Sequence, residues 1–134
     1  MDITRTETLP LEHEQDIVAA RQAVRKLTQE LKFSLVDQTK MVTAASEIAR
    51  NTLIYGGGGV MTWEVLVDGL KNGLRLRFED QGPGIPNLDL AMMDGWTSGS
   101  GLGMGLSGTK RLVNEFDIES QVGQGTRITI ARWK

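Results

Sequence analysis

Glu47 and Asn51 are the first residues whose types and spacing suggest chemistry. They lie four positions apart in a segment of helical periodicity, so their side chains share one helix face. The carbonyl oxygen of Asn51 is a ligand type that Mg²⁺ prefers, and a carboxylate beside it can accept a proton from an attacking hydroxyl or water. The same spacing is also common on solvated helix faces, so other features of the chain must support this interpretation.

Asp80 is the second candidate. It continues a strand-like alternation in which Leu74, Leu76 and Phe78 share one face, and this places a carboxylate on the apolar side. A carboxylate accepts hydrogen bonds and the exocyclic amine of adenine donates them, so Asp80 is a candidate adenine ligand. Thr126 is also polar, near a strand end and on an apolar face, and can complete the contact directly or through water.

Glycines are concentrated after Asp80. Gly82 and Gly84 would let the chain pass close to a bound base, and a second group opens a helical pattern whose free N–H groups would face an anion. The segment does not satisfy the phosphate-loop motif, and no hydrophobic strand precedes its G-x-G-x-x-G match. A flexible, glycine-rich linker remains the alternative. The residues predicted to surround the phosphates and a lid are Gly99, Gly101, Leu102, Gly103, Gly105 and Leu106.

The elements that must position these residues follow from hydrophobic periodicity. Helices are predicted over residues 12–33, 34–55 and 87–93, and from the glycine ladder to about Phe116. Strands are predicted over 2–9, 60–68, 73–80, 117–122 and 126–133, and a polar loop over 94–100. Ser34, with Asp37 three positions later, is a candidate helix cap, and Pro10 should end a first strand that lies at a sheet edge. Asp68–Gly69 and Asn72–Gly73 favour an antiparallel hairpin.

Composition excludes several classes of function. The length of 134 residues fits one domain over 1–134, and a net charge of -2 argues against general binding to nucleic acid or anionic membranes. No cysteine is present, and the single histidine, His13, cannot build a histidine metal site and is expected on the surface. With no signal peptide and no apolar run of roughly 18 residues, we expect a cytoplasmic protein.

Together, four motifs resemble the GHKL ATPase/kinase superfamily: E-x-x-x-N on a helix, D-x-G-x-G after a strand, G-x-G-x-G opening a helix, and G-T before the last strand. The resemblance implies a Bergerat fold, an α/β two-layer sandwich with a mixed, mostly antiparallel sheet, helices on one face and a lid over ATP. It implies that Asn51 holds Mg²⁺, Glu47 is the catalytic base, and Asp80 and Thr126 contact adenine.

The segments SEIARN, DQGPGI and IESQVGQGT are similar to one branch, the small serine/threonine kinases of bacterial partner-switching (stressosome) systems that act in stress responses. This resemblance implies phosphorylation of STAS-domain antagonist and stressosome scaffold proteins. It further implies that the released kinase activates a PP2C-type phosphatase. Arg50, Lys110 and Arg111 are then candidate phosphate or partner contacts.

Other functions share these motifs. An anti-sigma factor with serine kinase activity has every catalytic motif and differs in its partner-facing surface. A histidine kinase would need a phosphoacceptor histidine on a dimerising helical domain, and gyrase- or chaperone-type ATPases couple hydrolysis to large additional domains. A non-enzymatic alternative is a module that binds nucleotide without turning it over. The Glu47–Asn51 pair argues against this alternative.

Overall fold

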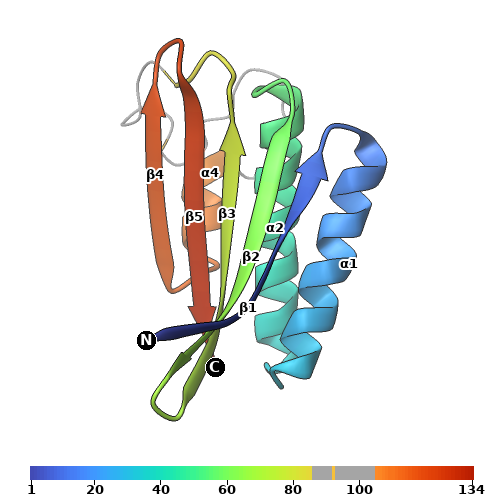
Figure 1. Ribbon diagram of the computed structural model, residues 1–134, viewed down its shortest axis with the longest axis vertical. Helices are drawn as coiled ribbons and strands as arrows, with labels where there is room; N and C mark the ends of the chain where they lie inside the picture. Colours follow the sequence, from blue (N-terminus) through green and yellow to red (C-terminus); the bar gives the residue numbers. More distant parts are fainter. Residues whose placement is uncertain (86–91, 93–104) are drawn as a thin grey trace.

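A computed structural model describes residues 1–85, 92 and 105–134 of the chain. One sheet is covered on one face by helices, as the family resemblance implies (Figure 1). The strands are β1 (Asp2–Leu11), β2 (Gly59–Asp68), β3 (Lys71–Asp80), β4 (Glu115–Gln121) and β5 (Gly125–Trp133). The helices are α1 (Glu14–Glu30), α2 (Leu35–Ile54) and α4 (Gly105–Lys110).

The strands follow the order β1-β2-β3-β5-β4, and every pairing among the described strands is antiparallel. The parallel component expected of a mixed sheet therefore does not occur there. β1 lies at an edge as predicted, but Pro10 does not end it, because Pro10 pairs with Val60 and the strand continues to Leu11. Proline has no N–H to donate, and an edge strand tolerates this loss.

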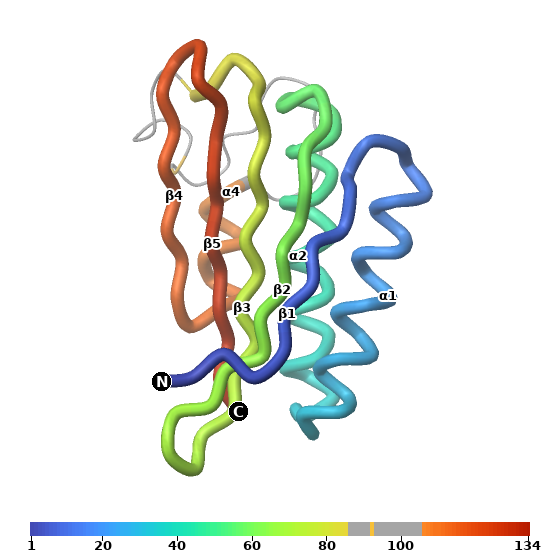
Figure 2. The backbone as a smooth tube through the Cα atoms, in the orientation of Figure 1, coloured from blue at the N-terminus to red at the C-terminus, as the bar shows by residue number. Residues whose placement is uncertain are grey.

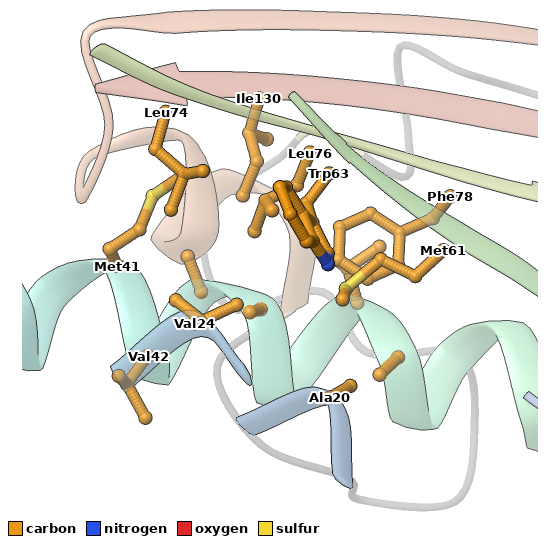
Figure 3. Packing of buried hydrophobic residues seen from close by; sticks show 14 of the residues in the cluster. Ala20, Val24, Met41, Val42, Met61, Trp63, Leu74, Leu76, Phe78 and Ile130 are labelled. Atoms are coloured by element: carbon orange, nitrogen blue, oxygen red, sulfur yellow. The ribbon is translucent and has the colours of Figure 1, made fainter. Parts of the chain in front are cut away.

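The core lies between the sheet and α2, with α1 packed beside α2. Figure 3 shows Leu74, Leu76, Phe78 and Ile130 pointing from the sheet toward α2, all of them at most 1% exposed. The predicted alternation of β3 is therefore confirmed. It also fixes which face of each neighbouring strand is buried, because residues paired across a sheet point to the same side.

Both long helices begin at specific caps. The Asp16 carboxylate accepts the backbone N–H of Glu12 at 2.8 Å and of His13 at 3.0 Å, and His13 is exposed as predicted. These two bonds lower the pKa of Asp16. At α2, the Ser34 hydroxyl accepts the N–H of Asp37 at 3.1 Å, which confirms the predicted cap.

The helix predicted from the glycine ladder to about Phe116 is wrong at its C-terminal end. α4 ends at Lys110, and Phe116 belongs to β4, where it pairs with Ile130. Apolar residues at both helical and alternating spacing made the sequence ambiguous here. Pairing with β5 decides the outcome, since it satisfies the backbone and buries the alternate side chains Phe116 and Ile118 against the core.

The helix predicted at 87–93 and the polar loop at 94–100 lie outside the described residues, except Met92, which packs against the core. No helix within the described ranges is long and apolar enough to cross a bilayer.

Candidate functional site

The polar residues predicted at strand ends meet at one end of the sheet. Figure 2 shows the end of β3, the β4–β5 turn and the C-terminal end of α2 together at this end. Two apolar rows cross the sheet below it, Leu76–Ile130–Phe116 and Phe78–Ile128–Ile118. The next positions along these strands are Asp80, Thr126 and Ser120. A polar row therefore borders the core on the helix-covered face.

Asp80 is held by backbone donors. Its Oδ1 accepts the N–H of Gly82 at 2.9 Å and of Thr126 at 3.2 Å. The sequence predicted that Asp80 and Thr126 share a site, and the structure brings them together through this second bond. The carboxylate is half-buried, so its orientation is fixed while part of its surface stays accessible.

Close backbone approach surrounds Asp80. A Cβ on Gly56 would lie 2.5 Å from Asp80 Oδ2, and a Cβ on Gly82 would lie 2.7 Å from Gly56 Cα. A Cβ on Gly125 would overlap the Asp80 carbonyl. Gly84, with φ +78°, instead packs against the Gln121 backbone. The predicted glycines thus hold the loop after β3 against α2 and β4. Gly56, the residue that follows the helix predicted over 34–55, belongs to the same group of close contacts.

The Glu47–Asn51 pair lies on α2, which ends beside Asp80. The backbone carbonyl of Asn51 accepts the N–H of Tyr55 at 2.9 Å and of Gly56 at 3.2 Å. The end of the helix therefore places Gly56 against the Asp80 carboxylate. Asn51 is half-buried. The last turn of α2 therefore connects the predicted metal ligand to the predicted base-binding residue.

Glu47 does not lie on a solvated helix face. It is 6% exposed, and its Oε1 has no hydrogen-bond partner among the described residues. Burial raises the pKa of this carboxyl above its usual value, and the nearby positive charge of Arg50 opposes the shift. A buried carboxylate oxygen without a partner is costly, so this atom is the strongest sign of a functional position on α2.

The glycine ladder is described only at its end. Gly105 is the first residue of α4, which lies beside α2 on the same face of the sheet (Figure 1). Leu106 is 5% exposed and belongs to the core. The other predicted ladder residues, Gly99, Gly101, Leu102 and Gly103, lie outside the described residues.

Ser120 is a site residue that the sequence did not single out. Its Oγ accepts the N–H of Ile85 at 2.7 Å, lies 2.8 Å from Thr126 Oγ1 and donates to the Gly125 carbonyl at 3.2 Å. The available signal was a hydroxyl at a core position, two residues after Ile118. Its significance depends on the β4–β5 pairing, which places it opposite Thr126.

An open depression of about 260 Å³ lies at the same end of the sheet. Three of its charged lining residues, Glu79, Glu119 and Arg127, are neighbours in the strand register and alternate with core residues, so they belong to the face without helices. The fourth charged residue that lines it is Asp80. Arg127 donates to the Glu119 carboxylate. Asp80, Ser120 and Thr126 of the polar row also line the depression, which therefore lies at the strand ends and includes residues from both faces of the sheet.

The described residues contain no group of three or more His, Cys, Asp and Glu side chains that could hold a metal ion by themselves. Oxygen ligands are nevertheless present on α2, in the side-chain amide of Asn51 and in Glu47 Oε1, which has no hydrogen-bond partner in the ranges that the structure describes. Such a sparse set fits Mg²⁺, which takes most of its ligands from phosphate and water in nucleotide sites.

Comparison with known families identifies the class. The model of the histidine kinase-, DNA gyrase B- and HSP90-like ATPase family matches residues 36–134, and the chain belongs to this family. The matched segment contains α2 except for its first residue, the Asp80 loop and the β4–β5 turn. The resemblance inferred from the four motifs is confirmed, and so is the fold class.

Individual relatives narrow the class. The chain is 48% identical over 120 residues to the serine/threonine-protein kinase RsbT of Bacillus subtilis, covering 90% of each. It is 32% identical over 119 residues to an anti-sigma F factor of Clostridium kluyveri, covering 84% of this chain and 82% of the relative. Both similarities span most of the molecule. The first, together with the family match, supports the predicted protein-kinase activity.

Solved structures share the fold. A structure of the RsbU and RsbW domains of Rv1364c from Mycobacterium tuberculosis matches with a TM-score of 0.65 at 21% identity, covering 96% of this chain and 32% of that longer chain. The mycobacterial sensor histidine kinase MprB matches with a TM-score of 0.52 at 17% identity, covering 96% of this chain and 97% of that one. These two similarities establish architecture alone.

Proposed function

We propose that this protein is an ATP-dependent serine/threonine protein kinase of a bacterial partner-switching pathway. The single observation that carries the proposal is Glu47, a buried carboxylate whose Oε1 has no hydrogen-bond partner within the described part of the chain. It lies one turn from Asn51 on a helix whose C-terminal end lies beside Asp80. Similarity to RsbT over 90% of both chains supports the class of reaction.

Asp80 recognises the adenine base in this proposal. Two backbone N–H groups hold Oδ1, and Oδ2 would accept a hydrogen bond from the exocyclic amine of adenine. Guanine presents a carbonyl oxygen at the equivalent position, which a carboxylate repels. The site should therefore bind ATP in preference to GTP.

Asn51 and Glu47 act at the phosphates. The Asn51 side-chain carbonyl would hold Mg²⁺, with phosphate oxygens and water supplying the remaining ligands. When bound, Mg²⁺ neutralises phosphate charge. Gly105 and the glycines before it would surround the phosphates, with backbone N–H groups as donors.

Glu47 is the proton acceptor. The hydroxyl oxygen of a partner serine or threonine attacks the γ-phosphorus, a new P–O bond forms, and the bond to the β-phosphate oxygen breaks with ADP leaving. The hydroxyl proton moves to the Glu47 carboxylate. Burial raises the pKa of this group, which makes its ionised form a stronger base than a solvated glutamate.

The proposed substrates are STAS-domain antagonist and stressosome scaffold proteins. Phosphorylation would add charge to the partner surface and release the kinase, which would then bind and activate a PP2C-type phosphatase. This order of events is implied by the family resemblance. We further propose that the protein acts in the cytoplasm without nucleic-acid or membrane partners.

The decisive experiment is incubation of the purified protein with γ-labelled ATP and candidate STAS and sigma-factor partners. The kinase proposal predicts label on a STAS serine or threonine, loss of labelling in Glu47→Gln, and retained nucleotide binding in that variant. Glu64→Gln is the matched control, because Glu64 is also buried, at 7% exposed, but pairs with Arg75 on the open face of the sheet. Undiminished labelling by Glu47→Gln would remove Glu47 as the base.

A second candidate is an anti-sigma factor with serine kinase activity, which the Clostridium kluyveri relative favours at lower identity. Stable binding to a sigma factor in the same experiment would support it. Release of free phosphate alone would indicate an ATPase, and nucleotide binding without turnover would indicate a regulatory module.

A further inference from the structure

The Ser120 hydroxyl lies where three segments of the site meet. Ser120 itself lies on β4, and its hydroxyl contacts the loop after β3 through the Ile85 N–H and the start of β5 through Thr126 Oγ1 and the Gly125 carbonyl. Ser120 is half-buried, so water competes only partly for these bonds. One hydroxyl therefore links the loop that follows Asp80 to the strand that carries Thr126.

The number of protons restricts how these bonds can be arranged. A serine hydroxyl has one proton and two lone pairs, and the Ile85 N–H occupies one lone pair at 2.7 Å. In one arrangement Ser120 donates to Gly125 and accepts from Thr126. In the other, Ser120 donates to Thr126, and the Thr126 proton is left for another acceptor.

The distances favour the second arrangement when a ligand is bound. The contact between Ser120 and Thr126 is 2.8 Å, an ordinary length for O–H···O, whereas the contact to Gly125 is longer at 3.2 Å. A ligand acceptor beside Thr126 therefore exchanges a long bond for a new one. The two hydroxyls keep their positions, and only their hydrogens rotate.

We propose that Ser120 is a positioning residue for base recognition, and this inference rests on the proposed ATP-dependent function. It forms a directed chain of hydrogen bonds that runs from the Ile85 N–H to Ser120, from Ser120 to Thr126, and from Thr126 to the acceptor ring nitrogen N1 of adenine. Each bond in such a chain polarises the next, so Thr126 becomes a stronger donor. Asp80, whose Oδ1 accepts the Thr126 N–H, would bind the amine of the same base edge.

This arrangement of hydrogen bonds would select adenine over guanine. Adenine offers a donor to Asp80 and an acceptor to Thr126, whereas guanine reverses both. Ser120 also fixes the loop that carries Gly82 and Gly84, because the Ile85 N–H has its partner on β4. A purely structural role for Ser120 would affect every nucleotide equally, and the proposed role affects the contact at N1 in particular.

The test is equilibrium binding of ATP and of its 1-deaza analogue, in which N1 is replaced by C–H, measured by calorimetry. The wild type should bind the analogue about three- to tenfold more weakly, as expected for one lost hydrogen bond. In Ser120→Ala this discrimination should fall toward onefold, and Ser120→Thr should restore it. Thr62→Ala is the control, since it removes a comparable hydroxyl pair, 2.9 Å from Thr8, on the open face.

The outcomes separate this inference from the proposed function. Wild-type protein that binds no ATP would overturn both. Wild-type protein that binds ATP but does not discriminate, or Ser120→Ala that discriminates like the wild type, would overturn the role of Ser120 alone. If Ser120→Ala does not fold, Ser120→Cys, whose thiol is a weak donor, provides the same comparison.

Discussion

Replacement of Gly56 by alanine should displace Asp80 and weaken nucleotide binding without changing any proposed ligand. The new Cβ would lie 2.5 Å from Asp80 Oδ2 and 2.6 Å from Asp80 Cβ, whereas ordinary contacts lie at 3.4–4 Å. Gly56 is fixed by its N–H bond to the Asn51 carbonyl at 3.2 Å, and Gly82 packs on its other side. The carboxylate must therefore move by about 1 Å.

A shift of this size breaks the two bonds that orient Asp80, the N–H of Gly82 at 2.9 Å and of Thr126 at 3.2 Å. Hydrogen bonds to a charged group contribute about 1.5–3 kcal/mol each, and water replaces part of this at a half-buried site. We therefore expect a total loss of about 1.5–3 kcal/mol in binding, or roughly 10- to 150-fold in Kd for ATP.

Calorimetric titration with ATP measures this effect, and thermal unfolding measures the accompanying change in stability. Gly57→Ala is the matched control, because Gly57 has a φ of +74° and a Cβ added there would meet no atom within 4 Å. That variant should lose about 1–2 kcal/mol of stability from backbone strain and retain ATP affinity. Unchanged ATP affinity in a folded Gly56→Ala protein would refute the close contact between Gly56 and the base-binding carboxylate.

Two further predictions concern stability. Burial raises the pKa of Glu47, so ionising this carboxyl destabilises the folded state. Glu47→Gln should therefore raise Tm at neutral pH. This gain should disappear below the usual pKa of 4.5, where Glu47 is protonated in both the folded and the unfolded state. Melting curves from about pH 4 to about pH 8 test this, and a gain independent of pH would contradict it. Arg132 and Asp37 form a partly buried ion pair at 2.6 Å, and Asp37→Asn should cost about 1–3 kcal/mol in urea unfolding. Strict additivity with Arg132→Met would show that the pair contributes no coupling energy.

Local pattern was sufficient for most elements of the fold. The alternation of β3 identified the buried face and placed Asp80 on it, and the cap at Ser34 located the start of α2. Prediction from hydrophobic spacing failed where one segment fitted both the helical and the strand period. Phe116 satisfied both helical and strand spacing, and only its pairing with Ile130 assigned it to a strand.

Burial of the candidate catalytic residue was not predictable from spacing. Helical periodicity placed Glu47 away from the middle of the apolar stripe, which is also typical of a solvated position. The structure buries it and leaves one oxygen without a partner among the described residues. Burial of a helix face depends on the elements that pack against it, and a helix alone carries no information about its neighbours.

The sequence by itself determined which residue types are present and how they repeat, and hence the motifs, most of the helices and strands, and the family. Tertiary structure alone decided which of them touch. Asp80, Ser120 and Thr126 form one row because β5 lies between β3 and β4, and Gly56 meets Asp80 because α2 ends at the same edge. Strand order and helix placement minimise the free energy of the whole chain, so contacts between distant segments cannot be read from local spacing.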